Sequence, residues 1–110
     1  MSMNIRWQGL ATPTALCHCA TCGQRFLAKK RIPHLFNDAR LDLGPLCPQC
    51  FAASPAQLRE RMLRYAYLIR LNRLRHPGSQ DHARHLEQSA REPSIRYPGL
   101  FSWLRYWRKT

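Results

Sequence analysis

The chain has 110 residues, and its 18 lysines and arginines outnumber its 6 acidic residues to give a formal net charge of +12. This length is enough for one domain, and six scattered carboxylates disfavour a two-carboxylate hydrolase or a calcium cage. No apolar run approaches the ~20 residues that a membrane-spanning helix needs, and a hydrophobic content of 45% argues against full disorder.

The first segment, residues 1–16, is predicted to be an irregular arm, because Trp7 is its one anchor and Pro13 interrupts regular structure. The segment has no uninterrupted apolar stretch of the kind that a secretory signal carries. We therefore expect a cytoplasmic protein, in which disulfide bonds are rare. An odd number of cysteines, here five, also fits metal binding better than a disulfide framework.

Two pairs of cysteines, each separated by two residues, dominate the next segment. Cys19 and Cys22 form the first pair, and Cys47 and Cys50 form the second. A C-x2-C turn aims both sulfurs at one point, so two such turns supply the four thiolates of a tetrahedral zinc site. Gly23 suits the backbone after the first turn, where a positive φ is often needed. The spacing predicts a structural Zn²⁺; the alternatives are a buried cluster of reduced thiols and a redox pair.

The residues beside the first pair leave one part of the ligand set open. Cys17 or His18 is an alternative ligand, although the C-x2-C geometry favours Cys19 and Cys22. We therefore treat Cys17 as a spare thiol and His18 as a neighbour of the site. His34, between the pairs, is a weaker candidate, because most such histidines are ordinary surface or core residues.

Between the cysteine pairs, two short strands around a loop are predicted, before the turn at Gly44. Three basic residues, Lys29, Lys30 and Arg31, would lie on this hairpin. They are candidates for contacts with phosphate groups, and the alternative is an ordinary charged turn.

Residues 54–76 are predicted to form the main helix. Ser54 suits the N-cap, Pro55 suits the first helical position, and Gln57 completes a capping box. Pro77 and the glycine after it end the segment.

Two apolar seams run along this predicted helix. The first contains Leu58, Met62, Tyr65, Ala66 and Ile69, and the second contains Leu63, Tyr67, Leu71 and Leu74. Two seams predict packing on two sides, one against the zinc module and the other against the C-terminal tail, a second copy or another protein subunit. The gaps between the seams hold arginines, which are candidates for phosphate contacts, with a solvated basic face as the alternative. They are Arg59, Arg70 and Arg73 on one ridge and Arg61, Arg64 and Arg75 on the other.

Residues 77–110 are predicted to hold a short polar helix and an aromatic, basic tail. The helix covers 79–91 and carries His82 and His85 on one face, either as surface residues or as a metal pair. One helical face of the tail is apolar, with Leu100, Trp103, Leu104 and Trp107. We expect this face to pack on the free seam of the main helix; the alternatives are an anionic membrane surface and stacking on unpaired bases.

The order of these elements resembles a treble-clef or zinc-ribbon module. It runs from the CATCG turn through a short hairpin to the CPQC turn and the helix capped by Ser54, over about residues 17–75. We expect a small α+β fold with a four-cysteine zinc module and a short β-hairpin, followed by a long basic helix and an α-helical C-terminal region; the resemblance covers the part of it up to the basic helix. The resemblance implies that the four paired cysteines hold the metal and that the first arginine ridge faces nucleic acid. The extra Cys17 and the residues between Cys50 and the helix depart from the pattern.

We divide the chain into an arm at 1–16, the zinc module and long helix at 17–76, and the remainder at 77–110, all within one compact domain. The function we expect is that of a non-enzymatic, zinc-stabilised protein that binds DNA or RNA through its arginines. It would act as a small regulator or as a subunit of a nucleoprotein particle of the ribosomal or CRISPR-effector kind.

Two other functions remain open: a protein-interaction module or inhibitor that masks an acidic or nucleic-acid-binding partner, and a basic membrane-surface protein. A membrane partner is the less favoured of these. An enzyme is the least favoured class, because the chain contains no P-loop, G-x-G-x-x-G, H-E-x-x-H or nucleophile motif.

Overall fold

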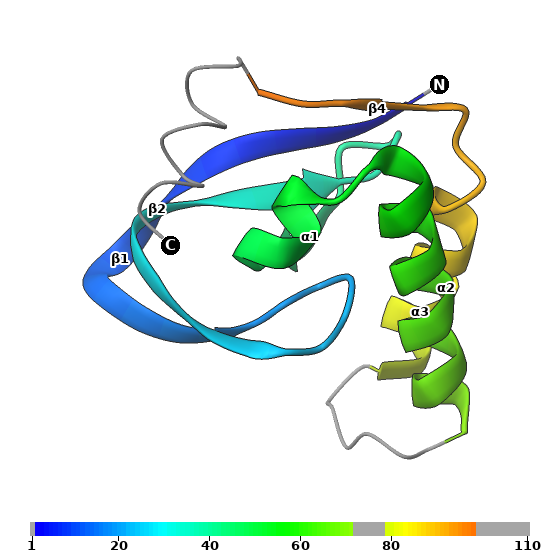
Figure 1. Ribbon diagram of the computed structural model, residues 1–110, viewed down its shortest axis with the longest axis horizontal. Coiled ribbons are helices and arrows are strands. Elements are labelled where there is room, and N and C mark those ends of the chain that lie inside the picture. Colours follow the sequence, from blue (N-terminus) through cyan, green and yellow to red (C-terminus); the bar gives the residue numbers. More distant parts are fainter. Residues whose placement is uncertain (1, 72–78, 99–110) are drawn as a thin grey trace.

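The computed structural model describes residues 2–71 and 79–98, which form a small α+β fold. Its elements are β1 (Ser2–His18), β2 (Arg25–Phe36), β3 (Asp42–Pro45), α1 (Pro48–Ala52), α2 (Pro55–Arg70), α3 (Ser79–Ser89) and β4 (Ser94–Arg96). The strands form one sheet in the order β3-β2-β1-β4. Helices α2 and α3 lie side by side at one end of this sheet, and α1 lies in front of it (Figure 1).

The N-terminal arm was predicted to be irregular, but it forms the long strand β1. Buried Met3 and Ile5 alternate with less buried neighbours, which is the period of a strand with one face on the core. Pro13 does not end the strand, because it falls within a register irregularity between Gly9 and Thr14, a place where sheets tolerate proline. Pairing with distant strands therefore overrides the local breaker.

The β1–β2 hairpin carries the first C-x2-C turn at its tip. The two strands are antiparallel, from Asn4 opposite Phe36 to His18 opposite Arg25. The hairpin bends, so that its tip returns toward α1 and α2 (Figure 1). The hairpin predicted between the cysteine pairs is also present, as β2 and β3 with Leu35 opposite Gly44. As a result, both C-x2-C turns reach the same side of the sheet.

The core lies between the sheet and the helices. Its largest fully buried side chains include Met3, Leu35, Leu46, Phe51, Leu58, Met62, Ile69 and Leu86. These residues come from both ends of the described chain, and burying each apolar side chain contributes ~1.5–3 kcal/mol. The core therefore joins the cysteine-containing segment and the C-terminal helix into one unit.

The start of α2 is confirmed as predicted. Ser54 Oγ accepts a hydrogen bond from the Gln57 N–H at 3.2 Å, and Gln57 Oε1 accepts one from the Ser54 N–H at 3.1 Å. The first predicted seam is buried in full. The helix ends at Arg70, and the predicted continuation, with Leu74, Arg73 and Arg75, lies outside the described residues.

The second predicted seam is not packed in the part of the chain that the structure describes. Leu63, Tyr67 and Leu71 expose 49%, 62% and 47% of their surface. Helix α3 packs beside the first seam through Ala83 and Leu86, so the described chain buries one seam of α2 and leaves the other accessible. Packing of the second seam on a second copy or another protein subunit stays a prediction.

The C-terminal part combines one predicted element with one that was missed. The polar helix is present as α3, close to its predicted range. β4 was not predicted, because its three residues carry no strand pattern; it pairs parallel to β1 with Ile95 opposite Met3. Residues 99–110, with the predicted aromatic face, lie outside the described residues. None of the described helices combines the length and apolar character needed to cross a membrane.

Candidate metal centre

The four paired cysteines converge on one point, as their spacing predicted. Their Sγ atoms all lie within 4.8 Å of one another; Cys19, Cys47 and Cys50 are buried and Cys22 is half-buried. The Sγ atoms of Cys22 and Cys47 are 3.7 Å apart. That distance is close to the edge of ~3.8 Å expected for a tetrahedron with metal–sulfur bonds of ~2.3 Å. The cluster thus has the ligand number and spacing of a tetrahedral metal site.

Hydrogen-bond donors around the sulfurs fit thiolate ligands. The Cys47 N–H donates to the Sγ of Cys19 at 3.3 Å, and the Cys50 N–H donates to the Sγ of Cys47 at 3.4 Å. The hydroxyl of Thr21, itself fully buried, lies 3.2 Å from the Sγ of Cys19. Donors directed at sulfur stabilise the deprotonated form, which is the form that binds metals.

The close approach of the thiols also shifts their pKa values in opposite directions. Hydrogen bonds from Cys22 and Cys47 lower the pKa of Cys19 well below its ordinary value. The same contacts with Cys19 raise the pKa values of Cys22 and Cys47. Four sulfurs at this spacing repel each other as thiolates, so a divalent cation at their centre would replace the shared protons.

Arg61 contacts the cluster from α2. Its Nη1 donates a hydrogen bond to the Sγ of Cys50 at 3.5 Å, and this bond raises the pKa of the guanidinium. Four thiolates around a divalent cation sum to a charge of −2, so a guanidinium beside them offsets part of that charge. Arg61 was predicted as a phosphate contact, but the fold directs it to the sulfurs.

The first C-x2-C turn is held tightly in its conformation. Gly23 has a φ of +77°, and a Cβ at this position would lie 2.6 Å from Cε1 of Tyr65. The Ala20 N–H donates to the carbonyl oxygen of Pro45 at 2.7 Å, which links the two cysteine-containing loops. The residue after the first pair must therefore be glycine for two reasons, the backbone conformation and the space.

The alternative ligands lie outside the cluster. Cys17 is half-buried in β1 with its Sγ 3.8 Å from the carbonyl oxygen of Ala15, and burial raises the pKa of its thiol. His18 is exposed on the same strand. His34 pairs through Nδ1 with the carboxylate of Asp42 at 2.9 Å. The cluster contains none of these three residues.

The two histidines of α3 have different surroundings. His82 Nε2 donates a hydrogen bond to the carbonyl oxygen of Ala20 at 2.8 Å, inside the first C-x2-C turn. Nδ1 of His85 is buried with no hydrogen-bond partner in the described ranges. Sequence reasoning missed the contact of His82, because nothing near this residue in the sequence indicates a partner 62 positions away.

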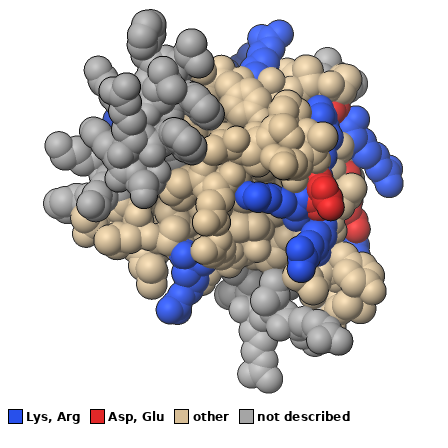
Figure 2. Space-filling model, in the orientation of Figure 1, with Lys and Arg blue, Asp and Glu red and all other residues tan. Residues whose placement is uncertain are grey.

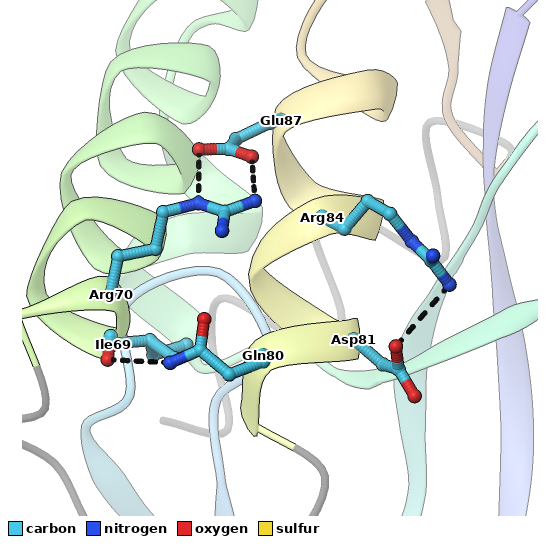
Figure 3. Close-up of polar contacts among 6 residues, drawn as sticks. All are labelled: Ile69, Arg70, Gln80, Asp81, Arg84 and Glu87. Atoms are coloured by element: carbon cyan, nitrogen blue, oxygen red, sulfur yellow. Dashed lines mark hydrogen bonds and ion pairs between the residues drawn. The ribbon is translucent and has the colours of Figure 1, made fainter.

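Three arginines of the predicted α2 ridges are engaged within the fold. Arg59 Nη2 donates to the carbonyl oxygen of Glu92 at 2.9 Å. Arg70 forms a two-pronged ion pair with Glu87, its Nε lying 2.8 Å from Oε2, and so joins α2 to α3 (Figure 3). Arg61 is the third, as described above.

The other predicted phosphate contacts are less constrained. Arg64 and Arg31 are exposed. The side chains of Lys29 and Lys30 lie outside the described part, as do Arg73 and Arg75. Phosphate contacts by these residues therefore stay a prediction.

Comparison with family models, with curated proteins and with solved structures gives no match. The molecule is therefore classified by its own geometry. It is a small α+β protein with four cysteines clustered within metal-binding distance.

Proposed function

We propose that the protein is a non-enzymatic, zinc-stabilised nucleic-acid-binding protein built around a module of the treble-clef or zinc-ribbon type. The observation that carries the proposal is the four-cysteine cluster, found in a chain whose formal net charge is +12. The cluster supports a structural metal, and the charge supports a polyanionic partner.

Zinc suits this donor set better than the other common metals. Four thiolates in a tetrahedral arrangement favour Zn²⁺, and a site with four protein ligands leaves no position open for substrate. The metal would be held by the four paired cysteines and would join the tip of the β1–β2 hairpin to α1. Structural zinc contributes ~10–16 kcal/mol of apparent binding free energy in small domains, so the ion would stabilise this end of the fold.

The charge distribution supports an anionic partner. Three of the acidic residues are already paired, Asp42 with His34, Asp81 with Arg84 and Glu87 with Arg70. On the face shown in Figure 2, the acidic side chains lie on the side of the helices, and basic side chains elsewhere on that face have no acidic neighbour. A Zn²⁺ ion bound by four thiolates would lower the formal charge only to about +10. Nucleic acid is the polyanion that best matches such an excess of arginine.

The experiment that tests this function is equilibrium binding of the full chain to DNA and RNA oligonucleotides, single-stranded and duplex, across a salt titration. Each phosphate contact releases counterions, so affinity should fall by roughly 10³-fold or more between ~50 and ~200 mM salt if six or more contacts form. Affinity that does not change with salt, or the absence of binding to every probe, would contradict the proposal.

A second candidate function, a protein-interaction module, is favoured by the exposed seam of α2. Leu63, Tyr67 and Leu71 place three large apolar side chains on one accessible helix face. Tagged wild-type protein and a Leu63→Glu/Tyr67→Glu variant, each purified from cells with and without nuclease treatment, separate the two functions. A protein partner that is retained by the wild type and lost from the variant supports the module, whereas recovery of nucleic acid alone supports the first proposal.

A further inference from the structure

An open cavity of about 430 Å³ lies beside β1 where β4 ends. Its walls include Arg6 and Trp7 from β1, Arg31 from β2, and Arg96 and Tyr97 at the end of β4. We call it the arginine cavity. Its volume falls within the ~300–1,000 Å³ of ordinary small-molecule sites. It shares no residue with the four-cysteine cluster, so its chemistry is separate from the metal.

The three arginines reach the cavity wall from three strands and from both faces of the sheet. Arg96 lies opposite Asn4 in the parallel β4–β1 pair, and Arg6 follows Asn4 by two residues on the same face of β1. Arg31 lies opposite Gly9, on the face of β1 that carries Trp7, and no atom lies within 4 Å of the place where a Cβ of Gly9 would be. The bare backbone at Gly9 therefore leaves room for the side chain of Arg31 beside β1.

The side chains of these three arginines, unlike those of Arg59, Arg61 and Arg70 on α2, have no internal partner. No side-chain hydrogen bond or ion pair joins Arg6, Arg31 or Arg96 to another residue of 2–71 and 79–98, although these ranges hold all six acidic residues. All three are exposed. Guanidinium groups gathered without an acidic neighbour repel each other, and a bound anion removes that repulsion and accepts their hydrogen bonds.

Two aromatic rings form the apolar part of the wall. Trp7 and Tyr97 are half-buried, and both rings contact buried Phe51, at centroid distances of 5.6 and 6.4 Å. The core therefore holds these rings in place beside the arginines. A fixed aromatic surface next to several guanidinium groups suits a ligand that has both a planar ring and a negative charge.

The geometry points to the arginine cavity as a binding site for one nucleotide unit, with its phosphate on arginines of the wall and its base against the aromatic residues. This inference deepens the proposed nucleic-acid binding and in that form rests on it. Within a nucleic acid the unit would be unpaired, because a stacked base in a duplex does not offer its face to a protein ring. The principal contact surface is then this end of the sheet and not the arginine ridges of α2.

Binding of a fluorescein-labelled single-stranded oligothymidylate to the full chain, measured by anisotropy, tests the site. The cavity variant is Arg31→Ala/Arg96→Ala, and the matched control is Arg40→Ala/Arg64→Ala, which removes the same charge from two exposed residues outside the cavity. The cavity variant is expected to lose at least about tenfold in affinity and the control less than about threefold. Both variants should melt like the wild type, because they remove exposed side chains.

Competition with thymidine monophosphate, thymidine and inorganic phosphate identifies the ligand chemistry. The monophosphate should displace the probe at a concentration about tenfold lower than either fragment, because only it reaches both parts of the wall. Equal losses in the two variants would overturn the cavity site and leave nucleic-acid binding intact. If the protein binds the monophosphate but no oligonucleotide, the cavity site stands and the proposed function is overturned. If it binds neither the monophosphate nor an oligonucleotide, the site and the proposed function are both overturned.

Discussion

His82 of α3 donates a hydrogen bond from Nε2 to the main-chain carbonyl oxygen of Ala20, 2.8 Å away across 62 positions of sequence. Its ring also packs edge-on against Tyr65, at a centroid distance of 5.8 Å. Since Ala20 lies between the first two cysteines of the cluster and also bonds to Pro45, the first C-x2-C turn is held from two sides. The C-terminal helix thus supports the candidate metal centre.

This contact predicts a stability cost for His82→Ala. Loss of the hydrogen bond, with the buried carbonyl left unpaired, should lower the free energy of unfolding by about 1–3 kcal/mol. Denaturation in urea measures this change, and Gln88→Ala, at an exposed position of the same helix, is the control. If the two variants have the same midpoint, α3 does not support the turn.

Gly23→Ala is predicted to be strongly destabilising. A left-handed backbone costs a non-glycine residue ~1–2 kcal/mol, and the new Cβ would also meet the ring of Tyr65 at 2.6 Å. In a Tyr65→Leu background the steric part should disappear and the backbone part should remain. A double-variant cycle measured by thermal or urea unfolding separates the two. Equal costs in both backgrounds would show that the ring does not limit this position.

Arg61→Met is predicted to weaken metal retention. The variant removes the hydrogen bond to the Sγ of Cys50 and one positive charge beside four thiolates. Mutation of a residue that contacts a metal ligand typically lowers the metal affinity by ~10–100-fold. We therefore expect Arg61→Met to lose about tenfold in zinc affinity, measured by competition with a chelator. Arg64→Met, exposed on the same helix, removes the same charge and should bind zinc like the wild type. A similar loss in Arg64→Met would assign the effect to general charge.

The Arg70–Glu87 pair predicts that the stability of the folded protein depends weakly on pH. The hydrogen bond from Arg70 lowers the pKa of the Glu87 carboxyl below its ordinary value of 4.5. A carboxyl with a lowered pKa in the folded state stabilises the protein above its unfolded pKa and loses that contribution as the pH falls through the folded pKa. The pair is exposed, so the contribution is small and is screened by salt.

Thermal unfolding of wild type and Glu87→Gln at several pH values measures this contribution. The difference in melting temperature should be largest near neutral pH in low salt and should shrink as the pH falls from about 5 to about 3. A difference that stays constant over this range would show that the ion pair is not its source.

Features that depend on neighbouring residues could be predicted from the sequence. The capping box of Ser54 and Gln57 acts within one helical turn, and the C-x2-C spacing forces each pair of sulfurs together locally. Both therefore appear as predicted. The convergence of the two pairs also followed, because two half-sites in one small chain each lack two of the ligands that a tetrahedral metal needs.

Features that depend on the tertiary arrangement could not be predicted from the sequence. β1 contains a proline and few strong strand formers, and its stability comes from register with β2 and β4. The directions of Arg59, Arg61 and Arg70 depend on what α2 packs against, so the sequence showed basic ridges but not their internal partners. The arginine cavity likewise joins residues from three strands, two of them unpredicted.

Metal content tests the central claim most directly. Wild type and Cys17→Ser, purified from zinc-supplemented medium, should each contain about one equivalent of zinc per chain, and chelation should unfold both. Cys47→Ser should contain no stoichiometric zinc and should lose cooperative unfolding, because it removes one thiolate of the cluster. A wild type without bound metal, or a Cys47→Ser variant with wild-type zinc content and melting, would contradict the account.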